Sequence, residues 1–167
     1  MGHAFRGYIV IRIGKFADIP RLTELMAEMY ERSKYKGRAE LDIPTTKSLF
    51  MSSMQRQGSK SAGGATVIVA ENNGIVEAFI VGILDRVYHV GNKLMATDLF
   101  YYATEKADAR DTIRLLDGFL KWAEEIPTVI EIRMGATDAI GDWSRTEKLY
   151  RRKGMDQAGV IYERKVQ

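Results

Sequence analysis

Short apolar stretches of the chain alternate with longer amphipathic ones, and the short stretches predict β-strands. Each is six to eleven residues long, and they are rich in β-branched and aromatic residues. Asn72-Asn73-Gly74 lies between two of them and predicts a tight hairpin, because Asn and Gly tolerate a positive φ. The strands are predicted at Tyr8–Ile13, Thr66–Glu71, Ile75–Leu84, Lys93–Ala103, Thr128–Met134 and Ala158–Lys165.

Apolar residues three and four positions apart predict the helices. The first begins after Asp18, which we expect to act as its N-cap, with Pro20 in the first turn. Asp42 sets the start of the second, and Gly154 is placed to end the last as its C′ residue. After the first, three further helices are predicted at Thr45–Gln57, Arg110–Glu125 and Asp142–Lys153.

The predicted order of elements is β-α-α-β-β-β-α-β-α-β. Strands and helices alternate regularly only in the second half, which favours a mixed sheet over a wholly parallel one. A length of 167 residues fits one domain. The expected fold class is therefore α/β, with a mixed sheet like those of α+β proteins. In the strand Lys93–Ala103, alternation puts Leu94, Ala96, Asp98, Phe100 and Tyr102 on one face.

The composition excludes several classes of function. The chain has no cysteine, which rules out disulfides, thiolate zinc sites and cysteine nucleophiles. His3 and His89 are the only histidines, and neither has evident partners for a metal site or a catalytic triad. No apolar run reaches the ~18–20 residues of a membrane span, and no signal-peptide pattern is present. We expect a cytoplasmic protein that is not attached to a membrane.

The charge balance gives little support for a nucleic-acid binder. The net charge is +3 and the pI about 9.1, which is common among small soluble domains. A role in binding nucleic acid would rest on this pI alone.

Residues near the C-terminus carry the most specific motif. Tyr150 lies on an amphipathic helix, and Gly154 follows it four residues later. This resembles the Asn-x-x-Ala-x-x-x-Tyr-x-x-x-Gly-Phe pattern of the GNAT N-acetyltransferase superfamily. The places of that pattern are occupied here by Trp143, Thr146, Tyr150, Gly154 and Met155.

The order of elements is similar to that of the same superfamily from about Tyr8 to Val166. The resemblance implies one acyltransferase domain over residues 1–167, with a splayed central sheet flanked by helices. It also implies acetyl-CoA as co-substrate, lying in the cleft where the sheet splays. The backbone of Leu99, Phe100 and Tyr101 would hold its pantetheine arm.

The resemblance places the pyrophosphate at the start of the following helix, where unpaired N–H groups and the helix dipole attract anions. The positions expected to bind it are Ala107, Arg110, Asp111 and Thr112. Family members carry Arg/Gln-x-x-Gly-x-Gly/Ala there, and in this chain the glycines are absent. Asp108 and Asp111 would repel the phosphates, whereas Arg110 would attract them.

Two residues are candidates for catalysis. The resemblance implies that Tyr150 protonates the leaving thiolate, and a phenol with a pKa near ~10 suits that task. The alternative is that Tyr150 only packs on the sheet. Asp98 is the candidate for the general base, and Glu77 and Glu131 are competing candidates. The alternative is that Asp98 has only a structural role in its strand.

The sequence therefore supports two hypotheses. In the first, the protein moves an acetyl group from acetyl-CoA to a primary amine by direct attack, without a covalent enzyme intermediate. The acceptor would be a small amine or a peptide, and a homodimer is compatible with the resemblance. In the second, motivated by the missing glycines, the chain is a catalytically inactive GNAT-fold protein that serves in binding or assembly.

Overall fold

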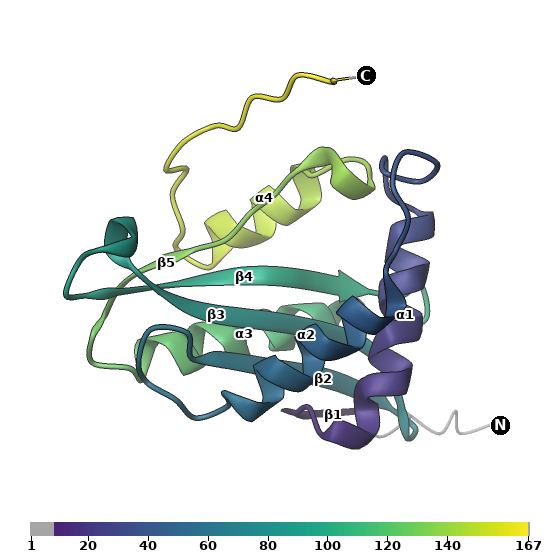
Figure 1. Ribbon diagram of the computed structural model, residues 1–167, viewed down its shortest axis with the longest axis horizontal. Helices are drawn as coiled ribbons and strands as arrows, with labels where there is room; N and C mark the ends of the chain where they lie inside the picture. The colour runs from purple at the N-terminus through teal and green to yellow at the C-terminus, as the bar shows by residue number, and fades with distance from the viewer. Residues whose placement is uncertain (1–8, 167) are drawn as a thin grey trace, which may run out of the picture.

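The computed structural model describes residues 9–166, which form a five-stranded mixed sheet covered by helices (Figure 1). The strands follow one another across the sheet in chain order. The first four pair antiparallel, and β5 pairs parallel to β4, as the helix between them in the chain requires. The strands are β1 (Ile9–Ile13), β2 (Ala65–Asn72), β3 (Ile75–Arg86), β4 (Leu94–Ala103) and β5 (Val129–Arg133).

The helices divide between the two faces of the sheet and enclose two apolar clusters. Helices α1 (Ile19–Glu31) and α2 (Ile43–Gln55) lie on the near face in Figure 1, and α3 (Ala109–Glu124) lies behind the sheet. Helix α4 (Ser144–Arg152) contributes Tyr150 to the same cluster as α3. Three short 3-10 turns, η1 (Phe16–Asp18), η2 (Val87–His89) and η3 (Asp138–Ile140), complete the elements.

Local signals in the sequence account for the start of α2 and for the turn between β2 and β3. Asp42 accepts a hydrogen bond from Thr45 N–H and caps α2, as predicted. Asn73 and Gly74 have φ values of 51° and 81°, as the predicted hairpin requires. Asp18 is the N-cap residue of α1, as predicted, but its side chain does not cap the helix. Its carboxylate makes no capping bond to α1 and instead binds the Arg12 guanidinium at 2.7 Å, a stronger charge-assisted contact.

The end of α4 confirms the predicted role of Gly154. It has a φ of 78°, and its N–H donates to Arg151 O at 3.0 Å. Met155 N–H donates to Tyr150 O at 3.1 Å, and Met155 packs against the cluster that contains Tyr150. These two bonds and the apolar contact form a Schellman motif. It fixes the last turn of the helix, in which Tyr150 lies.

Strand β4 does not keep one face along its whole length, so that prediction was wrong. Its pairing with β3 passes from Phe100↔Val81 to Asp98↔Gly82, which leaves Leu99 as an extra, bulged residue. Leu94 and Ala96 belong to the cluster under α3, whereas Phe100 and Tyr102 belong to the cluster under α1 and α2. The bulge exchanges the two faces of the strand.

The predicted last strand, Ala158–Lys165, is also wrong: residues 155–166 form neither helix nor strand. The segment runs away from the sheet, as the yellow end of the ribbon in Figure 1 shows. Ile161 and Tyr162 are 81% and 91% exposed. Its β-propensity is high, but no neighbouring strand supplies the hydrogen bonds that a strand requires. Tyr8, at the start of the first predicted strand, and His3 lie outside the described residues.

Within the part of the chain that the structure describes, no helix has the length and apolar character needed to cross a membrane.

Candidate active site

The sheet opens between β4 and β5. The two strands pair from Leu94↔Val129 to Thr97↔Arg133, and among residues 9–166 no strand pairs with this side of β4 beyond Thr97. The bulge at Leu99 follows directly, and Leu99 is 41% exposed. A bulge bends its strand and frees backbone groups from the ladder. The backbone of Leu99, Phe100 and Tyr101 therefore borders the opening.

Asp98, Gly135 and Tyr150 meet at the point where the strands part. Gly135 N–H donates to Asp98 Oδ1 at 3.0 Å, and Tyr150 Oη donates to Gly135 O at 3.1 Å. Three separate elements supply these groups: β4, the segment after β5, and α4. The structure thus brings together both predicted catalytic residues through one backbone unit.

Burial decides the protonation of this cluster. Tyr150 is 7% exposed, and desolvation, with smaller contributions from Asp98 and Tyr101, raises its pKa well above the usual range. The pKa of Asp98 is also raised, because desolvation outweighs the hydrogen bond from Gly135 N–H. Tyr150 therefore holds its proton at neutral pH, as a general acid must.

Tyr101 joins the opening to the first turn of α3. Its hydroxyl donates to the carbonyl oxygen of Thr112. Burial raises its pKa above the usual range, so this hydroxyl stays protonated. Ala107 and Tyr101 both pack against the cluster under α3. The side chain of Phe100 instead packs on the α1 and α2 side, so only its backbone borders the opening.

The start of α3 is already capped by a carboxylate. Asp108 Oδ1 accepts from Arg110 N–H at 2.8 Å, and Asp108 Oδ2 lies 3.0 Å from the Arg110 guanidinium. Asp111 is 1% exposed, and one of its carboxylate oxygens has no hydrogen-bond partner. Burial raises the pKa of Asp111. The strand edge fits a pantetheine arm, but these two carboxylates do not fit a pyrophosphate seated on the helix amides.

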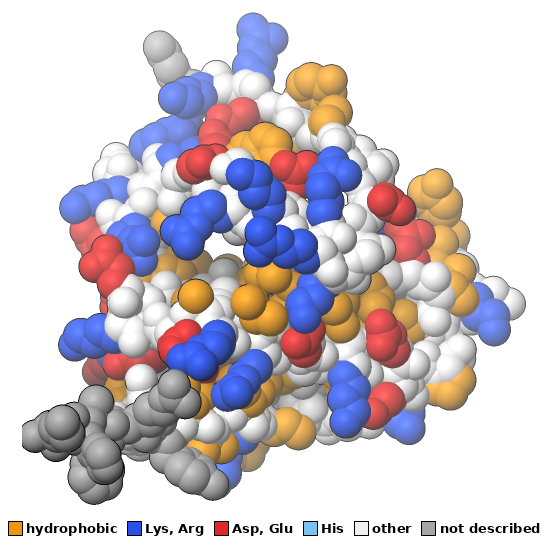
Figure 2. Space-filling model, turned by 180° about the vertical axis from the view of Figure 1, so that it is seen from behind, with side chains coloured by type: hydrophobic (Ala, Val, Ile, Leu, Met, Phe, Trp, Pro, Cys, Tyr) orange, Lys and Arg blue, Asp and Glu red, His pale blue; other side chains and the backbone are white. Residues whose placement is uncertain are grey.

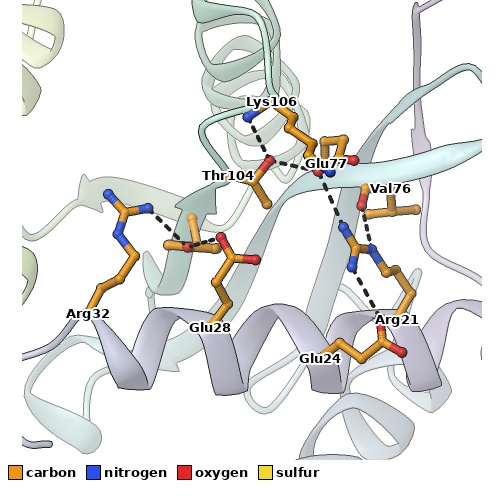
Figure 3. Close-up of polar contacts among 9 residues, drawn as sticks. Arg21, Glu24, Glu28, Arg32, Val76, Glu77, Thr104 and Lys106 are labelled. Atoms are coloured by element: carbon orange, nitrogen blue, oxygen red, sulfur yellow. Dashed lines mark hydrogen bonds and ion pairs between the residues drawn. The ribbon is translucent and has the colours of Figure 1, made fainter.

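Glu77, a competing candidate for the base, is held in a separate network on the α1 side of the sheet (Figure 3). It is buried, lies 3.3 Å from Arg21 Nη2 and accepts a 2.6 Å hydrogen bond from Thr104 Oγ1. In the same view Glu28 and Arg32 both bind the Tyr102 hydroxyl. The other competitor, Glu131, is bound to Arg133. Asp98 is the candidate whose carboxylate reaches Gly135.

The sequence did not predict that Gly135 belongs to the site or that Asp108 caps α3. Gly135 has no side chain that could mark it as part of a site, because the groups it contributes are a backbone N–H and carbonyl. Its place directly after a strand end was the available signal. Within residues 9–166, no three His, Cys, Asp or Glu side chains lie close enough to hold a metal ion.

No protein-family model and no curated protein sequence matches the chain. Solved structures do resemble it. An aminoglycoside N-acetyltransferase AAC(6')-Iy in complex with CoA aligns with a TM-score of 0.70 at 12% identity, over 95% of this chain and 95% of that one. Glucosamine-6-phosphate N-acetyltransferase from Arabidopsis thaliana aligns with a TM-score of 0.70 at 8% identity, over 96% and 99%.

The likeness is one of fold. A transcriptional regulator from Bacillus halodurans C-125 aligns almost as well, with a TM-score of 0.67 at 13% identity over 95% of this chain and 100% of that one. The chain therefore has the fold of the GNAT N-acetyltransferases, as its motif indicated. Its activity must be argued from the site.

Proposed function

We propose that this protein is an N-acetyltransferase that moves an acetyl group from acetyl-CoA to a primary amine. The observation that carries the proposal is the meeting of Asp98, Gly135 and Tyr150 where β4 and β5 part. An acid and a base candidate lie beside a strand edge with free backbone groups. The acetyltransferases of the same fold support the general kind of reaction.

The strand edge is proposed to bind the acyl donor. Free backbone N–H groups near Leu99–Tyr101 would hold the pantetheine arm and polarise the thioester carbonyl, as an oxyanion hole does. The acceptor amine would enter from the side of Asp98. When bound, the donor supplies an activated acyl group, so the chain needs no nucleophile of its own, which agrees with its lack of cysteine.

Asp98 and Tyr150 are proposed to move the protons. The Asp98 carboxylate, or a water molecule that it orders, takes a proton from the acceptor ammonium so that its nitrogen can attack. As the new C–N bond forms and the C–S bond breaks, Tyr150 Oη gives its proton to the leaving sulfur. Tyr150 must first release Gly135 O, and it recovers a proton from solvent or from the new amide nitrogen.

Turnover by matched variants tests this proposal. Wild-type protein, Tyr150→Phe and Tyr162→Phe are incubated with acetyl-CoA and a panel of amines, and both free thiol and acetylated product are measured. We expect Tyr150→Phe to lower turnover about 10²-fold or more. The control Tyr162→Phe should behave as wild type, because the side chain of Tyr162 is 91% exposed. Equal turnover by both variants would remove Tyr150 from the mechanism.

The capped start of α3 favours a second candidate function, an inactive binding or assembly protein with this fold. The Asp108 carboxylate already accepts a hydrogen bond from the backbone N–H of Arg110, and Asp111 adds a second carboxylate in the first turn of α3. This alternative predicts no stabilisation by CoA against thermal unfolding. A saturable shift in Tm with CoA, with the size expected from mass action, would count against it.

A further inference from the structure

One ion pair shows which flanks of α3 and α4 face each other. Lys153 Nζ, directly after α4, lies 2.6 Å from Asp117 Oδ1 on α3. Because helical residues are ~100° apart, residues three or four positions apart share a flank, as do those seven or eight apart. Arg145 and Arg152 therefore share a flank of α4 with Leu149, which packs against the apolar cluster under α3, and Arg114 shares the flank of Asp117.

These three arginines make no ion pair with the described residues. Arg114, Arg145 and Arg152 are exposed, and among residues 9–166 no carboxylate lies within ion-pair distance of their guanidinium groups. The neighbouring arginines differ. Arg110 is paired with Asp108, and Arg151, on the other flank of α4, is paired with Glu147 at 2.8 Å. Among the described residues of α4, Lys148 likewise makes no ion pair, whereas Lys153 is paired with Asp117 across the gap.

The surface is hollowed at this gap. Figure 2 shows a depression between α3 and α4, with apolar side chains on its floor and Lys and Arg side chains gathered over α4. Leu149 lies on the same flank of α4 and packs against the apolar cluster beneath. Tyr150, in the next position, reaches the opening between β4 and β5. The hollow thus continues the candidate active site outward to a cationic rim.

We propose that Arg114, Arg145 and Arg152 bind the diphosphate and 3′-phosphate of the acyl donor, in place of the backbone amides at the start of α3. This inference rests on the proposed function, whose donor it places. The Asp108 carboxylate blocks the usual anion position at the helix, and the three guanidinium groups provide a second one at the same cleft. Guanidinium binds phosphate bidentately, with charge-assisted hydrogen bonds.

Two features favour a mononucleotide phosphate over a nucleic acid as the occupant. The rim borders a hollow with an apolar floor, and it is interrupted by the paired Lys153 and Asp117. A nucleic-acid surface would instead need a longer positive stripe. The net charge of +3 is also small for such a partner.

Calorimetric titrations with three probes test the proposal: CoA, adenosine 3′,5′-bisphosphate and S-acetylpantetheine, which has no phosphate. They are made with wild-type protein, with Arg145→Ala/Arg152→Ala and with the control Arg151→Ala. We expect the double variant to lose at least about tenfold in affinity for CoA and the bisphosphate, and to keep its affinity for S-acetylpantetheine. Arg151→Ala should bind all three as wild type does.

The outcomes separate this inference from the proposed function. Unchanged affinity of the double variant for CoA and the bisphosphate would overturn the phosphate site and leave the acetyltransferase proposal standing. Loss of bisphosphate binding by a protein that never acetylates an amine would support the site without the activity. Equal losses in the double variant and Arg151→Ala, with salt-dependent retention of duplex DNA, would show a nonspecific polyanion surface and overturn it.

Discussion

A methyl group added at Gly82 tests the packing that holds the β4 bulge in place. Gly82 lies in β3 opposite Asp98, next to the shift in register. A Cβ atom there would lie 2.5 Å from Phe119 Cε2 and 2.9 Å from Trp122 Cζ3. Phe119 has no exposed surface, so its ring has no room to withdraw.

The expected cost of Gly82→Ala is that of an overpacked core, about 1–3 kcal/mol. For a chain of this length each kcal/mol lowers the Tm by about 2–4 °C, which gives a fall of about 2–12 °C. Because Gly82 pairs with Asp98, relief of the contact by a shift of β3 would also displace the candidate base. Activity should therefore fall more than the loss of folded protein explains.

Gly118→Ala is the matched control. Its Cβ would find Ile68 Cδ1 at 3.5 Å, an ordinary contact, and Gly118 lies inside α3. Replacement of a helical glycine by alanine should stabilise by about 0.5–1 kcal/mol. Both variants are followed by circular dichroism during heating. A Gly82→Ala protein that melts with the wild type would refute the packing argument.

Three further predictions concern single groups. Asp98→Asn keeps an oxygen atom that can accept the hydrogen bond from Gly135 N–H but removes the base. We therefore expect unimpaired stability and a kcat/KM that is about 10²-fold lower. An unchanged kcat/KM would show that Asp98 is not the base. Burial raises the pKa of Asp111, so the folded state favours the neutral carboxyl. The stability that this preference contributes is fully present below the unfolded pKa of ~3.9 and is lost as the pH rises and the carboxyl ionises. Asp111→Asn should therefore raise the Tm at pH 7 and match the wild type near pH 3, and a lower Tm at pH 7 would show that the helix dipole outweighs desolvation. Deletion of residues 157–167 should change the Tm by less than about 2 °C, since the apolar side chains described there are exposed, whereas a larger loss would show that the segment docks elsewhere.

The elements that the sequence predicted well are those with local causes. The α2 start and the hairpin depend on Asp42 and on Asn73-Gly74, whose side chains or φ preferences act within a few residues. The same holds for Tyr150, which Gly154 positions through the end of α4. Short-range chemistry of this kind can be read from one sequence.

The features that the sequence did not predict depend on distant partners. The face exchange at Leu99 arises from the pairing of β4 with β3, which the alternation of β4 alone does not contain. The segment around Ile161 has the propensity of a strand but no strand beside it. Gly135 joins the site through backbone groups that every residue has.

The proposed function requires that the opening between β4 and β5 bind acetyl-CoA beside Tyr150. The most direct test is calorimetric titration of wild-type protein and Tyr150→Phe with acetyl-CoA. We expect saturable binding of one donor per chain, with nearly equal affinity in both proteins, because Tyr150 acts on the leaving sulfur and Tyr150→Phe keeps the packing of the ring. No heat of binding at millimolar acetyl-CoA would contradict the account and leave the fold without this chemistry.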